Sequence, residues 1–390
     1  MNEESIFAAV LELKTKQERE SYLDQACAGN SSLREQVEEL LRAESDAGSF
    51  LNHPPLGLDA TIEASAGGRD TVDSGTWPIS MPFLEPCDKP DRIGKLDQYE
   101  IIEVVGQGGM GAVLRAFDTK LSRIVAVKVM APSLAASPTA VKRFLREATT
   151  AAAVHHDHVV TIHAVDDTHH PPYLVMQYVE GQTLQQKIDR EGALDLKQIL
   201  RIGSQMAAGL AAAHKHGLIH RDVKPANILL ENGVERVKIT DFGLARAADD
   251  LEMTQTGMIA GTPQYMSPEQ AKGEPIDTRS DLFSLGSVLY SMCTGLPAFR
   301  ADNTMAVMRR VCDDAPRPIG EVNAEIPVWL CEIVAKLLAK QPEQRFQSAQ
   351  EVAELLAQHL AHVQQPASCP MPPRVAGRTV GISLLEEKNL

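Results

Sequence analysis

His220-Arg221-Asp222-Val223-Lys224-Pro225-Ala226-Asn227 is the most informative run in this chain, because it holds three different polar groups at fixed spacing. Transfer of a phosphoryl group to a hydroxyl needs a base near the attacking oxygen, a cation beside the transferred phosphate and a ligand for a metal ion. Asp222, Lys224 and Asn227 supply a carboxylate, an ammonium and an amide for these tasks. Because so many identities are fixed together, the run is far more specific than a lone glycine motif.

A second motif, Asp241-Phe242-Gly243, begins fourteen residues after Asn227. Three residues alone carry little information. Their position after the first run, however, places Asp241 as a ligand for magnesium. We therefore expect Asn227 and Asp241 to hold the metal ion, Mg²⁺ or Mn²⁺.

A glycine-rich stretch lies upstream of both motifs, at residues 105–113. Glycines at 106, 108 and 111 would let a strand–turn–strand hairpin close over phosphates and leave backbone N–H groups to donate. Such a turn is often only a turn, and a dinucleotide-binding fold uses the same glycine spacing before a helix. Residues 114–117 continue as a strand, which disfavours the dinucleotide alternative. The residues expected to contact ATP here are Val105, Gly106, Gln107, Gly108, Gly109, Met110, Gly111, Ala112 and Val113.

Lys128 ends the apolar run Val125-Ala126-Val127-Lys128. A lysine in an apolar strand is usually an edge residue or extends its ammonium to water. The functional alternative places this ammonium on the α- and β-phosphates of ATP, held there by a carboxylate. Glu147, one helix later, is the candidate. Glu147 taken alone reads as a solvated helix residue, but its separation from Lys128 favours the paired role.

The pattern of apolar residues changes along the chain in a way that indicates the fold class. The segments expected as regular structure are strands at 99–105, 124–130, 159–165 and 173–177 and a helix at 140–154. Beyond residue 181 the pattern is mainly helical to about residue 362. A small strand-rich half followed by a larger helical half predicts an α+β fold of two lobes.

The flanking regions differ from this central part. Residues 1–51 have helical apolar spacing and hold 11 acidic and 5 basic residues, which predicts a small helical segment with an acidic surface. A regulatory or partner-docking role for it is the alternative. Residues 52–97 are rich in Pro and Gly and predict a flexible linker, whereas 98–362 form one domain and 363–390 a loose C-terminal tail.

Composition excludes several functional classes. A formal charge of −14 argues against a nucleic-acid partner and against a bare anionic membrane surface. The six cysteines are scattered, which is typical of reduced thiols in the cytoplasm. The acidic start does not resemble a secretory signal, and no apolar run reaches the ~18 residues needed to span a bilayer. The sequence therefore predicts a cytoplasmic protein without a membrane span.

Over residues 98–362 the chain resembles the eukaryotic-like serine/threonine protein kinases, most closely the bacterial ones. The motifs that carry the resemblance occur in the family's order: residues 105–113, Lys128, Glu147, residues 220–227, residues 241–243, and Ser267-Pro268-Glu269 where the family usually has Ala-Pro-Glu. This resemblance implies the two-lobed protein kinase fold, with ATP and Mg²⁺ between the lobes and protein serine or threonine as the substrate.

The resemblance also assigns roles outside the motifs. Glu269 is implied to pair with Arg345 late in the helical lobe, and Asp281 to brace the backbone of the catalytic loop. The residues implied to surround adenine are Ala126, Met176 as gatekeeper, and Gln177 to Val179 as the hinge. Gln177 stands where many relatives carry Glu, a change of little consequence because the hinge contact is made by the main chain.

The implied catalytic residues are Asp222 as base, Lys224 and Lys128. Lys224 two residues after Asp222, together with Thr262, favours serine and threonine over tyrosine, although dual specificity stays open. A pseudokinase or ATP-binding scaffold is the alternative class, but it typically loses Lys128, Asp222 or Asp241. Loop threonines 254 and 256 match the autophosphorylated stretch of relatives, which implies activation by autophosphorylation and favours a homodimer in which it occurs between molecules.

Overall fold

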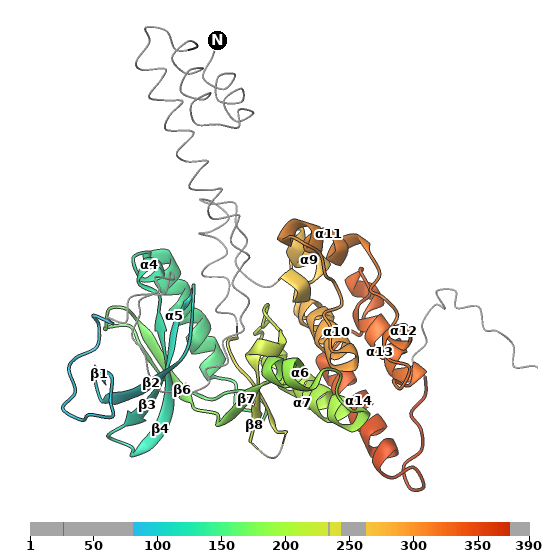
Figure 1. Cartoon of the computed structure of the whole chain (residues 1–390), viewed down its shortest axis with the longest axis horizontal. Helices are drawn as coiled ribbons and strands as arrows, with labels where there is room; N and C mark the ends of the chain where they lie inside the picture. The colour runs from blue at the N-terminus through green and yellow to red at the C-terminus, as the bar shows by residue number, and fades with distance from the viewer. Residues whose placement is uncertain (1–25, 27–80, 233–234, 243–262, 375–390) are drawn as a thin grey trace, which may run out of the picture. The chain divides into compact units, whose positions relative to one another are not determined.

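The computed structural model of the chain describes residues 26, 81–232, 235–242 and 263–374 (Figure 1). The chain divides into two compact units, residues 1–77 and 78–390, and every element described below belongs to the second. Apart from Ala26, which is helical, the predicted helical segment 1–51 lies outside the described residues.

Strands come first and helices dominate after residue 183, as the sequence predicts. The strands are β1 (Gly94–Leu96), β2 (Tyr99–Gly108), β3 (Gly111–Asp118), β4 (Arg123–Met130), β5 (Ile162–Asp166), β6 (Tyr173–Gln177), β7 (Gly181–Thr183), β8 (Ile228–Glu231) and β9 (Val237–Ile239). The helices are α4 (Pro132–Ala135), α5 (Pro138–Ala152), α6 (Leu184–Glu191), α7 (Leu196–Lys215), α9 (Pro268–Ala271), α10 (Thr278–Thr294), α11 (Thr304–Asp313), α12 (Ile319–Val322), α13 (Val328–Leu337) and α14 (Ala349–Gln364), with 3₁₀ turns η1 (Pro225–Asn227), η2 (Pro263–Tyr265) and η3 (Pro342–Gln344).

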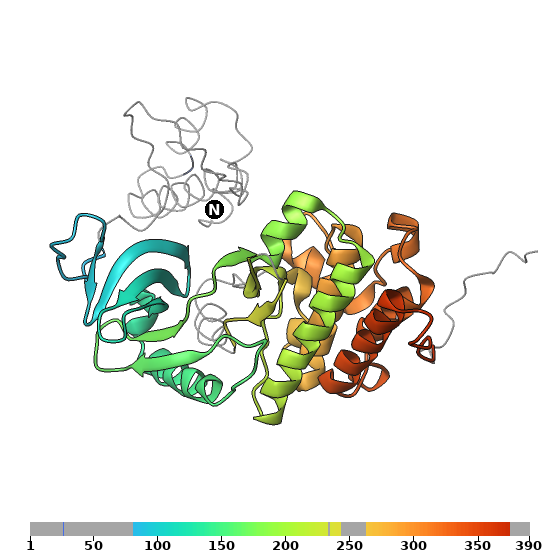
Figure 2. The same ribbon diagram turned by 90° about the horizontal axis from the view of Figure 1, so that it is seen from below.

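The small lobe is a six-stranded antiparallel sheet in the order β1-β2-β3-β4-β6-β5. Figure 2 shows this sheet strongly curved, with the helix α5 beside it. Alternate residues of β3 are buried, including Leu114 and Ala116, because successive side chains of a strand point to opposite faces. The predicted strand at 159–165 is shorter in the structure, because Val159 and Val160 pair with Ile239 of β9 instead of joining β5.

The predicted flexible linker 52–97 is wrong from residue 81 onward, whereas residues 52–80 lie outside the described residues. From residue 81 onward the chain packs on the small lobe, where Phe83 and Leu84 contact its apolar core. The backbones of Glu85 and Lys95 exchange hydrogen bonds of 2.8 Å in each direction. Proline and glycine in this stretch therefore shape an ordered turn that leads into β1 and do not keep it flexible.

The predicted C-terminal tail is also ordered in part. Helix α14 runs to Gln364, and His362 Nδ1 then donates to the backbone oxygen of Cys369 across 2.8 Å. Arg374 pairs with Glu332 of α13 at 2.6 Å. Residues 363–374 thus continue the helical lobe, whereas residues 375–390 lie outside the described residues.

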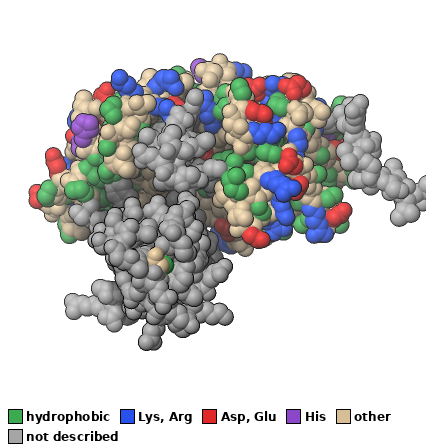
Figure 3. All heavy atoms as spheres, turned by 90° about the horizontal axis from the view of Figure 1, so that it is seen from above, with side chains coloured by type: hydrophobic (Ala, Val, Ile, Leu, Met, Phe, Trp, Pro, Cys, Tyr) green, Lys and Arg blue, Asp and Glu red, His purple; other side chains and the backbone are tan. Residues whose placement is uncertain are grey.

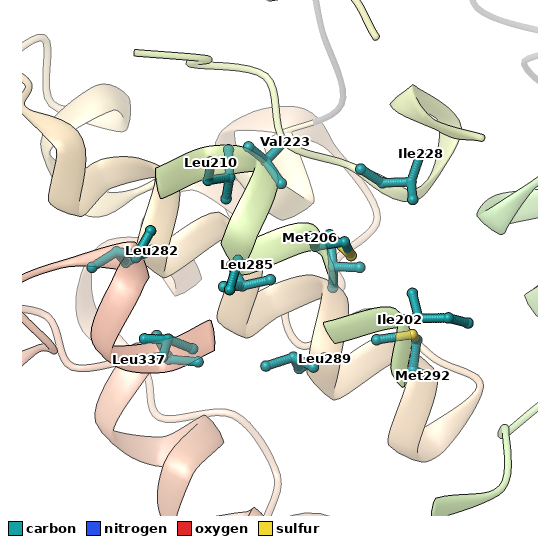
Figure 4. Close-up of a cluster of buried hydrophobic side chains, with 14 of the residues drawn as sticks. Ile202, Met206, Leu210, Val223, Ile228, Leu282, Leu285, Leu289, Met292 and Leu337 are labelled. Carbon is teal, nitrogen blue, oxygen red and sulfur yellow. The ribbon is translucent and has the colours of Figure 1, made fainter. Parts of the chain in front are cut away.

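The helical lobe is built around α7 and α10. Figure 4 shows side chains of α7, α10 and α13 meeting there, among them Met206, Leu285 and Leu337, all of which are buried. Gly286 allows α10 and α13 to approach closely, since a Cβ at that position would lie 2.7 Å from the Cβ of Leu337. Burial of such apolar surface stabilises the lobe by roughly 25 cal/mol per Å². This core therefore supports the loop at residues 220–227.

A second sheet, β7-β8-β9, lies in the helical lobe and was not expected from the sequence. Its strands have three or four residues each, too few to show an alternating pattern. The position of this sheet matters, because β8 directly follows the run 220–227 and β9 directly precedes Thr240 and Asp241.

The surface mixes both signs of charge. On the face shown in Figure 3, Lys and Arg side chains lie among Asp and Glu side chains. Within the described ranges, no helix combines the length and apolarity needed to cross a bilayer. The cysteines in this part of the chain are free thiols: Cys87, Cys293, Cys312, Cys331 and Cys369.

Candidate active site

The glycine-rich residues 105–113 form the tip of the β2–β3 hairpin, where Gly108 faces Gly111. At Gly111 the backbone has a φ of 140°, and a Cβ there would lie 1.9 Å from the carbonyl oxygen of Val129. Only glycine fits this position. A Cβ on Gly106 or Gly108 would meet no protein atom within 4 Å, so these two face open space. The strand–turn–strand arrangement agrees with the predicted phosphate-covering hairpin.

Lys128 on β4 reaches the helical half of the site. Its side chain is buried, and its Nζ lies 2.6 Å from Oδ1 of Asp241. Burial raises the pKa of the Asp241 carboxyl, but the charge of Lys128 outweighs it and holds that pKa below its ordinary value. Asp241 is therefore ionised at neutral pH.

The predicted pair of Lys128 with Glu147 is not formed between these two described residues, and this corrects the sequence-based assignment. Glu147 is buried on α5, where its Oε1 lies 3.7 Å from Nη1 of Arg221. A buried carboxylate is costly unless a cation lies near it. Because Lys128 neutralises the partly buried Asp241 and Arg221 approaches the buried Glu147, each of these acids has a cation near it in this arrangement.

Asp222, Lys224 and Asn227 converge as predicted. Oδ2 of Asp222 accepts from Lys224 Nζ at 2.9 Å and from Asn227 Nδ2 at 3.0 Å. The same nitrogen of Asn227 donates to the backbone oxygen of Asp222 at 2.8 Å. The turn η1, which starts at Pro225, closes the chain so that these residues meet. A carboxylate is thus held in a fixed orientation beside an ammonium.

His220 ties this loop to the segment that carries Asp241. Its Nε2 lies 2.9 Å from the backbone oxygen of Thr240, and its Nδ1 lies 3.2 Å from the backbone N–H of Asp222. A carbonyl can only accept, so Nε2 carries the proton and Nδ1 accepts from Asp222. The ring packs on buried Phe242 with centroids 4.5 Å apart. These contacts fix Asp222 relative to Asp241.

Asp281 braces the loop backbone, as the resemblance implied. It is buried at the start of α10 and accepts from the backbone N–H groups of His220 and Arg221, both at 2.8 Å. It also lies 2.7 Å from Nε2 of His214. Arg221 adopts a positive φ of 67°, which is unfavourable for a residue with a Cβ. The carboxylate of Asp281 helps to hold this conformation.

The implied pair of Glu269 and Arg345 is formed and buried. The guanidinium meets the carboxylate through two bonds of 2.7 and 2.8 Å. Burial raises the pKa of Glu269, and the bonds from Arg345 and Ser280 outweigh it, so the pKa lies below its usual range. This pair anchors α9 on the helical lobe.

Most of the residues assigned to adenine lie on two neighbouring strands of the small lobe, β4 and β6. Ala126 on β4 is the direct pairing partner of Met176 on β6. Met176 is buried, and Gln177 follows it as the last residue of β6. The backbone N–H of Gln177 donates to the backbone oxygen of Thr161 at 2.8 Å. Val179, two residues later, is partly buried.

The oxygen ligands predicted for the metal suit Mg²⁺. Asn227 donates through its amide nitrogen, so its amide oxygen is the atom that can ligate. Asp241 contributes a carboxylate that stays ionised. Hard oxygen donors of these two kinds fit Mg²⁺.

Some expected residues cannot be placed. Gly243, Thr254, Thr256 and Thr262 lie outside the described residues. Sequence reasoning in turn missed Gln270, whose side chain reaches the catalytic loop. Its only signal was its position directly after Ser267-Pro268-Glu269.

Comparison with known proteins agrees with this geometry. Residues 99–359 match the model of the protein kinase domain. Serine/threonine-protein kinase PknB of Mycolicibacterium smegmatis is 42% identical over 67% of this chain and 43% of its own length. A probable serine/threonine-protein kinase of Clostridium acetobutylicum is 38% identical over 67% of this chain and 40% of its own length. This chain therefore spans less than half the length of these curated relatives.

A solved structure shows the same fold. The kinase domain of Mycobacterium tuberculosis PknI is similar with a TM-score of 0.53 at 27% identity, covering 67% of this chain and 96% of that one. Its double mutant C20A_R136A is similar with a TM-score of 0.56 at 26% identity, over the same shares of both chains. Together with the family match over residues 99–359, these relatives show that the chain belongs to the protein kinase domain family.

Proposed function

We propose that this protein is a serine/threonine protein kinase that transfers the γ-phosphoryl group of ATP to hydroxyls of protein substrates. The observation that carries the proposal is the contact of Lys128 with Asp241, on the segment that His220 ties to the loop of Asp222. Lys128 and Asp241 come from different lobes, and their meeting gathers both kinds of charge that phosphoryl transfer needs. The curated names of PknB and its relatives support the same activity.

In the proposed reaction, Asp222 orients the substrate hydroxyl and accepts its proton. The bond between the γ-phosphorus and the bridging oxygen breaks, a bond to the substrate oxygen forms, and ADP leaves. Lys128 binds the α- and β-phosphates, and Lys224 offsets charge on the transferred group. Asn227 and Asp241 would hold Mg²⁺, which neutralises phosphate charge when bound. The chain contributes mainly position and electrostatics to a loose transition state.

The test is incubation of the purified chain with γ-labelled ATP, magnesium and a generic basic protein, followed by analysis of the labelled amino acids. We expect label on serine and threonine. Tight ATP binding without any transfer would instead support the scaffold alternative. Parallel reactions with Mn²⁺ would show whether that ion replaces Mg²⁺.

We further propose that phosphate on Thr254 or Thr256 activates the enzyme through Arg221. Arg221 already approaches the carboxylate of Glu147 at 3.7 Å. A phosphate carries more charge than a carboxylate and would compete for this guanidinium. Glu147 would then be released to pair with Lys128, which is the pairing that the sequence predicts.

Replacement of both Thr254 and Thr256 by Ala is expected to lower kcat about tenfold or more, because a charge-assisted hydrogen bond to Arg221 is lost. Steady-state kinetics after incubation with ATP measures the effect. Thr304→Ala, at an exposed position on α11, is the matched control. Unchanged turnover in the double variant would refute this mode of activation.

We propose that this phosphorylation occurs between two copies of the chain, so its initial rate per molecule should rise with protein concentration. A separate segment 1–51 is part of the same proposal, and so is a kinase domain that extends beyond 98–362 to include the packed residues 81–97 and 363–374. We also place the protein in the cytoplasm, a location with which the free thiols of the described part agree.

A further inference from the structure

Gln270 connects α9, which the pair of Glu269 and Arg345 anchors, to the catalytic loop at residues 220–227. It lies on α9, and its Nε2 donates to the backbone oxygen of Arg221 across 2.7 Å. Its Oε1 accepts from the backbone N–H of Ser267 at 3.0 Å, while the N–H of Gln270 donates to Oγ of Ser267 at 3.3 Å. One side-chain amide therefore links two separate stretches of backbone.

The orientation of this amide is fixed by its partners. The N–H of Ser267 can only donate, so it requires the amide oxygen of Gln270. The nitrogen of the same amide is then directed to Arg221, whose carbonyl can only accept. Gln270 is partly buried, so water does not readily replace these two bonds. Among the uncharged side chains, only a carboxamide meets both requirements at this length.

The carbonyl that Gln270 holds belongs to a residue of the loop whose backbone is already constrained. Arg221 has a φ of 67°, and its N–H is held by Asp281 at 2.8 Å on the opposite side of the residue. Asp281 thus fixes the peptide before Arg221, and Gln270 fixes the peptide after it. The second of these peptides contains the N–H of Asp222, which donates to Nδ1 of His220. Rotation of this peptide would move the Asp222 carboxylate.

We propose that Gln270 is a positioning residue for phosphoryl transfer, which holds the Arg221–Asp222 peptide and so aims the carboxylate of Asp222. The proposal rests on the proposed kinase activity. Because Gln270 lies on α9, which Glu269 and Arg345 anchor to the helical lobe, it also transmits the position of that anchor to the catalytic loop. Gln270 touches neither substrate nor nucleotide in this role.

The replacement Gln270→Glu gives a test that a merely structural role would not pass. Above its pKa the new carboxyl of Glu is ionised and can only accept. It then faces the carbonyl oxygen of Arg221, and the two oxygens repel each other and displace the Arg221–Asp222 peptide. Below its pKa the protonated carboxyl donates to Arg221 and still accepts from Ser267. Facing a carbonyl raises the pKa of a carboxyl above its usual value of about 4.3. The ratio of variant to wild-type kcat should therefore rise as the pH falls.

At pH 8 we expect kcat of Gln270→Glu to be reduced about tenfold or more, with KM for ATP unchanged, and the deficit to shrink toward pH 5.5. The charged and titratable groups of α9 and of the surrounding elements are Glu269 on α9, Lys272 at its C-cap, Arg345, Cys312 on α11, Arg221, Asp222 and Asp281. They are present in both proteins, so the ratio of kcat values cancels their own titration.

Gln205→Glu is the matched control. Gln205 on α7 also bridges two backbone groups, accepting from Val237 N–H at 2.9 Å and donating to Glu235 at 3.4 Å. Its two partners are residues 235 and 237, outside the catalytic loop. The ratio of Gln205→Glu kcat to wild-type kcat should therefore be independent of pH. A deficit in Gln270→Glu that is equal at every pH, or a raised KM for ATP with normal kcat, would overturn the proposal.

Hydrogen exchange of the Asp222 amide tests the role of Gln270 independently of the proposed kinase activity. Gln270→Ala should speed exchange of the Asp222 amide at least about tenfold, whether or not the wild-type chain phosphorylates anything. Wild-type chain assayed in parallel reports on the kinase activity alone. Unchanged exchange at the Asp222 amide would show that Gln270 does not hold this peptide.

Discussion

Asp222→Asn is expected to reduce kcat by about 10² to 10⁴ while ATP binding stays unchanged, because general-base assistance contributes about this much. The asparagine amide can still occupy the position between Lys224 and Asn227, so the loop should keep its shape. It cannot accept the proton of the substrate hydroxyl. Single-turnover phosphoryl transfer and an ATP-binding titration on the same preparation measure the two properties separately.

Asp302→Asn, at an exposed position before α11, serves as the control for the same chemical change. It should leave both properties as they are in the wild type. Full transfer activity in Asp222→Asn would contradict the role assigned to Asp222. Loss of ATP binding in that variant would show that the residue acts on the nucleotide instead.

Arg345→Met is expected to lower the free energy of unfolding at pH 7 by about 3–5 kcal/mol, because it leaves the buried carboxylate of Glu269 without its cation. All five N–H groups of Arg345 are used, on both oxygens of Glu269 and on the carbonyls of Ala339, Lys340 and Arg279. Denaturant unfolding of both proteins at several pH values measures the loss.

The pH dependence of this loss has a definite sign. The folded-state pKa of Glu269 is depressed in the wild type, so the pair stabilises fully above the unfolded pKa of about 4.3 and less as the pH falls through the folded pKa. Without Arg345, the cation that most opposes the effect of burial is lost, so the pKa of Glu269 is higher in the folded variant than in the folded wild type. The difference between the two proteins should therefore shrink as the pH falls from 7 toward 4.

Arg374→Met is the matched control, since it breaks an exposed pair with Glu332 of similar length, 2.6 Å. Surface ion pairs contribute about 0–1 kcal/mol, so its effect should be several-fold smaller than that of Arg345→Met. Equal losses in the two variants would mean that the buried pair is not what stabilises the anchor of α9.

The sequence predicted most of the fold and of the site because both depend on patterns among residues that are close together in the sequence. The strands of the small lobe show apolar runs, and the groups from Asp222 to Asn227 lie within one short loop whose spacing fixes their geometry. The pairing of Glu269 with Arg345 spans 76 positions, and family resemblance, not local pattern, indicated it.

What the sequence could not predict depends on long-range choices between partners. Lys128 has both Asp241 and Glu147 as acidic candidates, and the structure pairs it with Asp241. No local signal distinguishes these two carboxylates, because both lie far from Lys128 in the sequence and only folding decides which of them contacts it. Gln270 was missed for the same reason, since its target is a backbone carbonyl 49 residues away.

A crystal structure grown with an ATP analogue and magnesium tests the central claim most directly. Lys128, Asp222, Asn227 and Asp241 should then surround one metal–triphosphate cluster, with the amide oxygen of Asn227 and a carboxylate oxygen of Asp241 about 2.0–2.1 Å from Mg²⁺. Lys128 should contact the α- and β-phosphates. A structure in which nucleotide is bound but these four side chains point apart would contradict the account.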